Sequence, residues 1–201
     1  MIRAVIFDFG NVICTFDLRR FLDRVLQYTD HTILEMMGNM PALSRASIQY
    51  ESGLMNSEEY FREISRIGNL RMPREEFIEA YSSIFTPIPD VFTLIKSLKS
   101  SYRLGLLSNT NEWHFLHSIR PLDLFPLFDA VTLSYEVRAM KPAPAIYGDM
   151  LQKLSLPSAE CVYIDDLPEN VDAASRLGMH ALLFTSPETL RADLRRAGIA
   201  M

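Results

Sequence analysis

The sequence has few cysteines, no strongly basic segment and no long uninterrupted apolar run. Its two cysteines, Cys14 and Cys161, both lie in apolar segments, which favours free buried thiols in a reducing compartment. A net charge of −5 without a basic stripe or an arginine-rich tail argues against nucleic acid as a partner. No apolar run approaches the roughly 18 residues of a membrane span, and a strand that starts by residue 4 leaves no room for a signal peptide. We therefore expect a cytoplasmic protein that binds neither nucleic acid nor membranes.

The chain is long enough to bury a large core. It has 201 residues, of which 48% are hydrophobic and 22% are charged, in the range of globular proteins. This length suits one large domain, or a domain that carries an insertion.

Short apolar segments alternate with helical patterns at the start of the chain and again after residue 88. The first strand, Val5–Phe7, is apolar on both faces, as is typical of the middle of a parallel sheet. The further predicted strands are residues 103–107, 130–133, 161–164 and 181–184, and the predicted helices are 91–99, 112–119, 145–154, 168–177 and 187–197. Because helices separate the strands, we expect an α/β fold, a doubly wound parallel sheet with helices on both faces.

The segment between the first strand and residue 88 shows helical patterns only. Helices are expected at residues 18–28, 33–37, 43–52, 57–67 and 74–85. Gly38-Asn39 is expected to end the second of them, and Gly53 to end the third in a left-handed conformation. The predicted organisation is therefore a core of residues 1–15 plus 88–201, with an inserted all-helical domain of residues 16–87.

Polar residues with related chemistry follow the predicted strands. They are Asp8, Ser108, Asn109, Lys141, Asp165 and Asp166. In a parallel sheet the carboxyl ends of the strands share one edge, where α/β proteins place their ligands. Clustered carboxylates require a cation, and hard oxygen ligands suit Mg²⁺. A lysine beside a hydroxyl and an amide suits a phosphate group, which an aspartate in the same site is placed to attack.

This ordered set resembles the haloacid dehalogenase (HAD) superfamily. The four stretches that resemble the motifs of that superfamily are Phe7–Val12, Leu106–Asn109, Met140–Tyr147 and Tyr163–Asp166. The helical insertion is similar to the mobile cap that covers the active site in one large subgroup, subfamily IA. The sequence Gly10-Asn11-Val12 looks like a branch of that subgroup that contains sugar-phosphate phosphatases.

The resemblance implies a Mg²⁺-dependent phosphatase that hydrolyses small phosphate monoesters, sugar phosphates in particular, through an aspartyl phosphate. It implies that Asp8 is the nucleophile and also a metal ligand. Phosphate would be bound by Ser108, Asn109 and Lys141, with Ser108 and Lys141 also catalytic. The other implied metal ligands are the backbone carbonyl of Gly10 and the carboxylates of Asp165 and Asp166. We expect Asp166 to bind the metal directly and Asp165 to support it, because successive residues after a strand point in different directions.

One position departs from the pattern of phosphatases in this superfamily. Most of them carry a second aspartate two residues after the nucleophile as general acid and base, and this chain has Gly10 there. Such a group is typically worth about 10²–10⁴-fold in rate. Three interpretations remain open: a substrate with a good leaving group, a proton supplied by another group or by water, or a protein that is not a phosphatase.

Three alternatives to a phosphatase follow from the same residues. A dehalogenase of this superfamily uses the same aspartate without metal, but it typically lacks the acidic pair Asp165-Asp166. A phospho-receiver domain has its acidic pair on the first strand, which is the reverse of the order found in this chain. A binding or regulatory protein on a HAD fold is consistent with Gly10, whereas the other retained groups argue against it.

Two further pairs of residues have an ordinary and a functional interpretation. His114 and His117 are spaced to share a helix face and to bind a metal, but without a third ligand a packing or surface role is favoured. Tyr50 and Glu51 precede the turn at Gly53, which leaves open whether they face the cleft.

Overall fold

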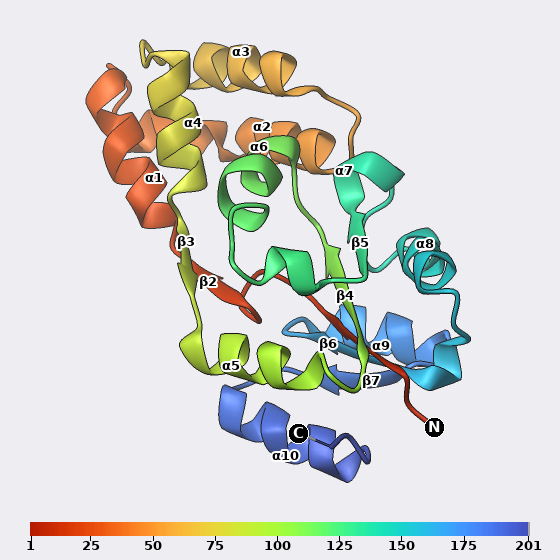
Figure 1. The fold of residues 1–201 in the computed structure, drawn as a ribbon. Helices are drawn as coiled ribbons and strands as arrows, with labels where there is room; N and C mark the ends of the chain where they lie inside the picture. The colour runs from red at the N-terminus through yellow and green to blue at the C-terminus, as the bar shows by residue number, and fades with distance from the viewer. Residues whose placement is uncertain (201) are drawn as a thin grey trace.

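The core is a five-stranded parallel sheet in the order β5-β4-β1-β6-β7 (Figure 1). The computed structural model describes residues 1–200, without the side chain of Ile33. The strands are β1 (Ala4–Phe7), β4 (Arg103–Ser108), β5 (Ala130–Leu133), β6 (Cys161–Asp165) and β7 (His180–Leu183). The chain builds outward from β1 to β5 and then returns to the other side of β1. Such a reversal opens a crevice at the carboxyl ends of the central strands.

Side chains that alternate along β1 build two separate apolar layers, one on each face of the sheet. Val5 and Phe7 pack against α5 (Pro89–Leu98) and α10 (Pro187–Arg196). Ala4 and Ile6 face the opposite layer, which is formed with α8 (Pro144–Leu154) and α9 (Pro168–Arg176). Because both faces of β1 are fully buried, the strand needs apolar residues at every position. The predicted doubly wound parallel sheet is confirmed.

Four helices of the insertion form their own apolar cluster above the carboxyl edge of the sheet (Figure 1). They are α1 (Leu18–Val25), followed by the 3₁₀ turn Leu26–Tyr28, α2 (Ile33–Glu51), α3 (Ser57–Gly68) and α4 (Arg74–Ser82). The cluster is rich in aromatic rings, with Tyr50 and Tyr60 stacked at 4.5 Å between centroids. Residues of the core also enter it, since the Trp113 ring lies 5.7 Å from Tyr50.

The two helices predicted at 33–37 and 43–52 are wrong, because α2 is one continuous helix of 19 residues. Gly38-Asn39 does not end it, and Pro41 lies in its interior. A capping box between Thr32 and Glu35 starts the helix, and the packing of its second half into the insertion's apolar cluster outweighs the local helix breakers. The left-handed stop at Gly53 is confirmed, with φ of +67°.

The predicted helical insertion is confirmed, but the sequence did not reveal a short sheet where the insertion joins the core. A two-stranded antiparallel sheet pairs β2 (Cys14–Phe16) with β3 (Phe85–Pro87) at the two points where the chain crosses between core and insertion. The helix predicted over 74–85 therefore ends at Ser82. Three-residue strands are too short to show an alternating pattern, which is why the sequence did not reveal them.

The remaining segments differ from the predictions mainly at their ends. The helix predicted at 112–119 begins as α6 (Glu112–His114) and continues as a π-helical turn, Phe115–Ile119. A four-residue helix, α7 (Ser134–Val137), and the 3₁₀ turns Phe125–Leu127 and Ser158–Glu160 were not predicted. Both cysteines are buried and free. No helix in the described part of the chain is both long and apolar enough for a membrane crossing.

Candidate active site

Lys141 links two aspartates at the carboxyl edge of the sheet. Asp8 follows β1 directly, and its carboxylate lies 2.6 Å from the Lys141 ammonium group. The same ammonium group lies 2.7 Å from Asp165 at the end of β6. All three side chains are almost completely buried. Strands β1 and β6 are direct neighbours in the sheet, so their ends bring together two carboxylates that are far apart in sequence.

Burial and charge shift the pKa values of this group in ways that matter for catalysis. Burial raises the pKa of Asp8 to about 6, and the neighbouring Asp165 adds to the rise, whereas Lys141 opposes it. Burial lowers the pKa of Lys141, but the two carboxylates outweigh burial and leave it raised. The lysine therefore stays protonated at neutral pH and holds part of the negative charge of the site.

Asp165 is fixed by more hydrogen bonds than any other acid in the site. It is fully buried and accepts from the Lys141 ammonium group, the Tyr163 hydroxyl, the Leu167 backbone N–H and the Asn170 side-chain amide. These contacts occupy both carboxylate oxygens. Asp165 is thus placed to hold Lys141 and the loop after β6, and it has little capacity left for another ligand.

Asp166 is only half-buried and accepts a single side-chain hydrogen bond, from the Asn11 amide at 3.1 Å. Asn11 adopts a left-handed conformation with φ of +53°, which turns the chain back after Asp8 and Gly10. One oxygen from each of Asp8, Asp165 and Asp166 lies within 4.8 Å of the others. The Lys141 ammonium group pairs with two of these three carboxylates, Asp8 and Asp165, so negative charge and hard oxygen donors remain in excess, which fits a divalent cation such as Mg²⁺.

Asn109 positions Lys141 through the backbone. Its side chain accepts from the Lys141 backbone N–H at 2.8 Å and donates to the Lys141 carbonyl at 3.1 Å. Because the side-chain amide is occupied in this way, the backbone N–H is the group of Asn109 that stays available for a ligand. Ser108, at the end of β4, is buried, and its hydroxyl makes only a long contact of 3.5 Å with the carbonyl of Asn109.

A cavity of about 240 Å³ lies between this edge of the sheet and the helical insertion. Its core side includes Gly10, Ser108 and Asn109, and its insertion side includes Glu51 and Tyr81. Much of the remaining wall is apolar, formed by Phe9, Phe16, Leu18, Ile84 and Phe85. The sequence left open whether Glu51 faces the cleft, and the structure places it there. Tyr50 instead points into the apolar cluster of the insertion.

His114 belongs to the wall of this cavity as a neutral, packed side chain. Its ring stacks on Tyr81 at 4.2 Å, its Nε2 lies 3.0 Å from the Tyr81 carbonyl, and its Nδ1 lies 3.1 Å from the Asn111 amide. The carbonyl can only accept, so Nε2 carries the proton and Nδ1 accepts from the amide. Burial lowers the pKa of His114 to about 4. His117 is exposed, in agreement with the packing and surface roles that the sequence favoured for this pair.

The structure brings together the residues that the sequence selected at separate strand ends. Asp8, Lys141, Asp165 and Asp166 form one cluster, and Gly10, Ser108 and Asn109 border the adjoining cavity. Three supporting residues were missed: Asn11, Tyr163 and Asn170. Tyr163 gave a usable signal, because a polar aromatic residue two positions before Asp165 on a buried strand points to the same face of the sheet.

Comparison with known proteins agrees with this geometry. The model of the haloacid dehalogenase-like hydrolase family matches residues 2–178. A D-ribitol-5-phosphate phosphatase of Bacteroides thetaiotaomicron is 26% identical and is matched over 89% of each chain. A predicted HAD-like family hydrolase from Porphyromonas gingivalis is 27% identical, superposes with a TM-score of 0.80 and is covered, like this chain, over 100% of its length.

A HAD family enzyme from B. thetaiotaomicron, solved as a complex with magnesium and inorganic phosphate, has the same fold. It superposes with a TM-score of 0.78 at 22% identity, covering 92% of this chain and 95% of that one. The family model spans most of the chain, including β1, β4, β6 and the acidic and basic residues that follow these strands. On this evidence the chain belongs to the haloacid dehalogenase-like hydrolase family.

Proposed function

We propose that this hydrolase is a Mg²⁺-dependent phosphatase of small phosphate monoesters, with sugar and polyol phosphates as the favoured class. The observation that carries the proposal is the cluster of Asp8, Asp165 and Asp166, with the Lys141 ammonium group bound to the first two of them. A dehalogenase needs the nucleophile but has no use for the acidic pair. The 26% identical relative described as a D-ribitol-5-phosphate phosphatase supports the substrate class.

In this proposal Asp8, Asp166 and the Gly10 carbonyl hold the metal ion, and Asp165 supports it from a more buried position. Asp166 has the freer carboxylate, with one side-chain donor, whereas both oxygens of Asp165 are hydrogen-bonded. Bound Mg²⁺ would neutralise negative charge between the carboxylates and a phosphate group.

The residues of the chain have separate roles in the proposed reaction. The free oxygen of Asp8 attacks phosphorus and forms an aspartyl phosphate, which water then hydrolyses. Lys141 reduces the repulsion between the nucleophile and the phosphate oxygens. Ser108 and Asn109 border the cavity, and we propose that the Ser108 hydroxyl and the Asn109 backbone N–H bind those oxygens.

We also propose that residues 16–87 form a cap domain that closes this site over a core of residues 1–15 plus 88–201. The β2–β3 pair carries both crossings of the chain and marks the connection between the two parts. The cap supplies one wall of the cavity, and a volume of about 240 Å³ suits a small metabolite better than a polymer.

The test is phosphate release from a panel of aryl, anomeric and alkyl phosphates, with Mg²⁺ and with excess EDTA. We expect hydrolysis that requires Mg²⁺ and is lost in EDTA. A parallel assay of halide release from 2-chloropropionate distinguishes the dehalogenase. Halide release without metal, or a folded protein that is inert toward every phosphate ester, would contradict the proposal.

A further inference from the structure

Glu51 is the one acid on the cap side of the cavity. It is the last residue of α2, and it borders the same cavity as Gly10 and Ser108. Its carboxyl group makes no hydrogen bond or ion pair with any residue that the structure describes, whereas its backbone carbonyl accepts from the Ser134 hydroxyl at 2.6 Å. An acid placed without a partner beside an apolar cavity is costly for stability, so its position calls for a functional reason.

The surroundings of Glu51 favour a carboxyl group that carries a proton for part of the time. Burial raises its pKa to about 7, and no charged neighbour opposes the shift. The titratable groups that face it are Tyr60 on α3, Tyr81 on α4 and His114 on α6. Burial raises the pKa of both phenols and lowers that of the imidazole to about 4, so all three are neutral around pH 7.

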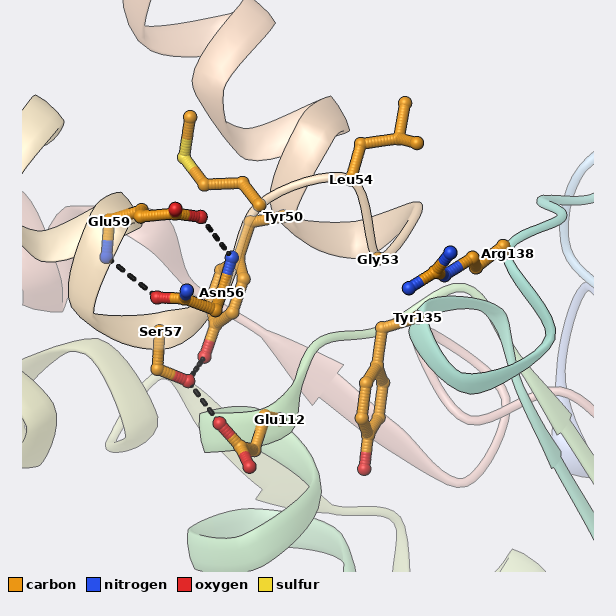
Figure 2. Close-up of a pocket in the computed structure, with 10 residues that line it drawn as sticks. Tyr50, Gly53, Leu54, Asn56, Ser57, Glu59, Glu112, Tyr135 and Arg138 are labelled. Atoms are coloured by element: carbon orange, nitrogen blue, oxygen red, sulfur yellow. Dashed lines mark hydrogen bonds between the residues drawn. The ribbon is translucent and has the colours of Figure 1, made fainter.

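The end of α2 is anchored to the core on both sides of Glu51. The Tyr50 hydroxyl lies 2.7 Å from the Ser57 hydroxyl, which in turn donates to Glu112 of the core. Figure 2 shows these three side chains in a row. The Tyr50 hydroxyl also accepts from the Trp113 backbone N–H at 3.1 Å. These contacts tie the cap to the loop that follows Ser108. Glu51 therefore keeps a fixed place relative to the phosphate-binding residues.

The next turn of the chain is held equally tightly. Gly53 lies against the backbone of Tyr135, so closely that a Cβ atom there would come within 2.1 Å of the Tyr135 oxygen (Figure 2). The Ser134 hydroxyl that holds the Glu51 carbonyl also accepts from the Thr110 backbone N–H at 2.9 Å. The loop that follows β4 and the short helix α7 that follows β5 thus fix the end of α2.

Among the described residues, no carboxylic acid lines the core side of the cavity. Gly10 occupies the position where phosphatases of this type carry a second aspartate, and it also borders the cavity. A Cβ atom at Gly10 would contact only the Phe16 ring, at 3.9 Å, and Gly10 does not have a positive φ. The position is therefore open space in the cavity wall rather than a site where a side chain is sterically excluded.

We propose that Glu51 supplies, from the cap, the proton that no residue at position 10 can supply; this rests on the proposed phosphatase function. As Asp8 forms its bond to phosphorus, the bond to the ester oxygen breaks, and that oxygen keeps the electron pair and takes the proton of Glu51. The Glu51 carboxylate then accepts a proton from the water that attacks the aspartyl phosphate. Orthophosphate leaves, and both acids return to their starting states.

The test compares leaving groups in Glu51→Gln and in a matched control, Glu79→Gln, which neutralises an exposed glutamate of α4. For p-nitrophenyl phosphate, whose leaving group needs no proton, Glu51→Gln should change kcat/KM by less than about threefold. For an alkyl phosphate such as glycerol 3-phosphate, it should lower kcat/KM by about 10²-fold or more. Glu79→Gln should leave both substrates unaffected.

The pH profile provides an independent measurement. Because the first step needs protonated Glu51, wild-type kcat/KM for the alkyl ester should fall as the pH rises above about 7, the pKa of this group. The fall should be absent in Glu51→Gln. Gly10→Asp in the Glu51→Gln background should restore the alkyl ester activity, since the new carboxyl enters the same cavity.

The activities of the variants distinguish a proton donor at Glu51 from a residue that binds substrate. Equal losses on both esters in Glu51→Gln, through a raised KM, would mean that Glu51 binds substrate, and this would overturn the inference. An unchanged leaving-group dependence would also overturn it, while hydrolysis by the wild type would leave the phosphatase proposal standing. Absence of any hydrolysis by the wild type, including p-nitrophenyl phosphate with Mg²⁺, would instead overturn the phosphatase proposal.

Discussion

Two acids, Asp165 in the core and Glu51 on the cap side of the cavity, show how differently the core and the cap are built. Asp165 is completely buried and has four hydrogen-bond donors, one of them the Lys141 ammonium group. Glu51 is half-buried on the cap side of the cavity, and its carboxyl group has no donor among the described residues. A carboxylate with this many partners is held in place, whereas burial without partners favours the protonated form of an acid. The acid of the core is therefore suited to positioning its neighbours, and the acid of the cap to exchanging a proton.

The largest effect should come from removing the proposed nucleophile of the core, Asp8. Asp8→Asn keeps the size of the side chain but removes the attacking oxygen, so kcat should fall by at least about 10⁴-fold. The measurement is phosphate release with Mg²⁺, with circular dichroism to verify the fold. Activity close to that of the wild type in a folded Asp8→Asn protein would rule out Asp8 as the nucleophile.

The acidic pair should divide into a structural member and a metal-binding member. Asp165→Asn places an amide against several donors and removes one of the two partners of Lys141, so we expect a loss of about 3–5 kcal/mol in the free energy of unfolding. Asp166→Asn should leave stability nearly unchanged and weaken Mg²⁺ binding instead. Urea unfolding and Mg²⁺ titration of both variants measure this, and the reverse ranking in both experiments would refute the assignment.

The stability of the folded protein should depend on pH through His114, which lines the cavity. Its pKa in the folded chain is about 4, below the ordinary value of 6.5, so the unfolded chain binds the proton more readily. The stability of the folded state is therefore complete above pH 6.5 and is lost as the pH falls toward 4, by about 3 kcal/mol. His114→Gln should remove this dependence, while His117→Gln on the exposed face should keep it. Urea unfolding at several pH values is the measurement.

The smallest effect concerns the tight contact between cap and core at Gly53. Gly53→Ala and Gly198→Ala both place an alanine at a positive φ, but only Gly53 lies against another backbone, whereas nothing lies near Gly198. We expect about 1 kcal/mol of destabilisation from the conformation alone at Gly198, and about 2 kcal/mol or more at Gly53. Thermal unfolding of the two variants compares them. Equal losses would show that the chain moves easily away from Tyr135.

Much of the core could be predicted because its signals are local. Each of β1, β4, β5 and β6 was located from a short apolar segment to within a residue at either end, and the polar residues after them follow from the rule that parallel strands end at one edge. The insertion was harder. Pro41 and Gly38 are local helix breakers, but α2 starts with a capping box and packs into the apolar cluster of the insertion, and it is continuous in the structure.

The sequence alone determined which polar residues follow the strands, and in which order: Asp8, then Ser108, then Lys141, then the acidic pair. It could do so because a strand and the polar residue that follows it are recognised from a few neighbouring residues. Only the tertiary structure decided which carboxylate is saturated and which is free, that the Asn109 amide holds Lys141, and that Glu51 faces Gly10 across a cavity. These outcomes depend on contacts between residues tens of positions apart, and such contacts are set by the packing of whole elements rather than by any local pattern.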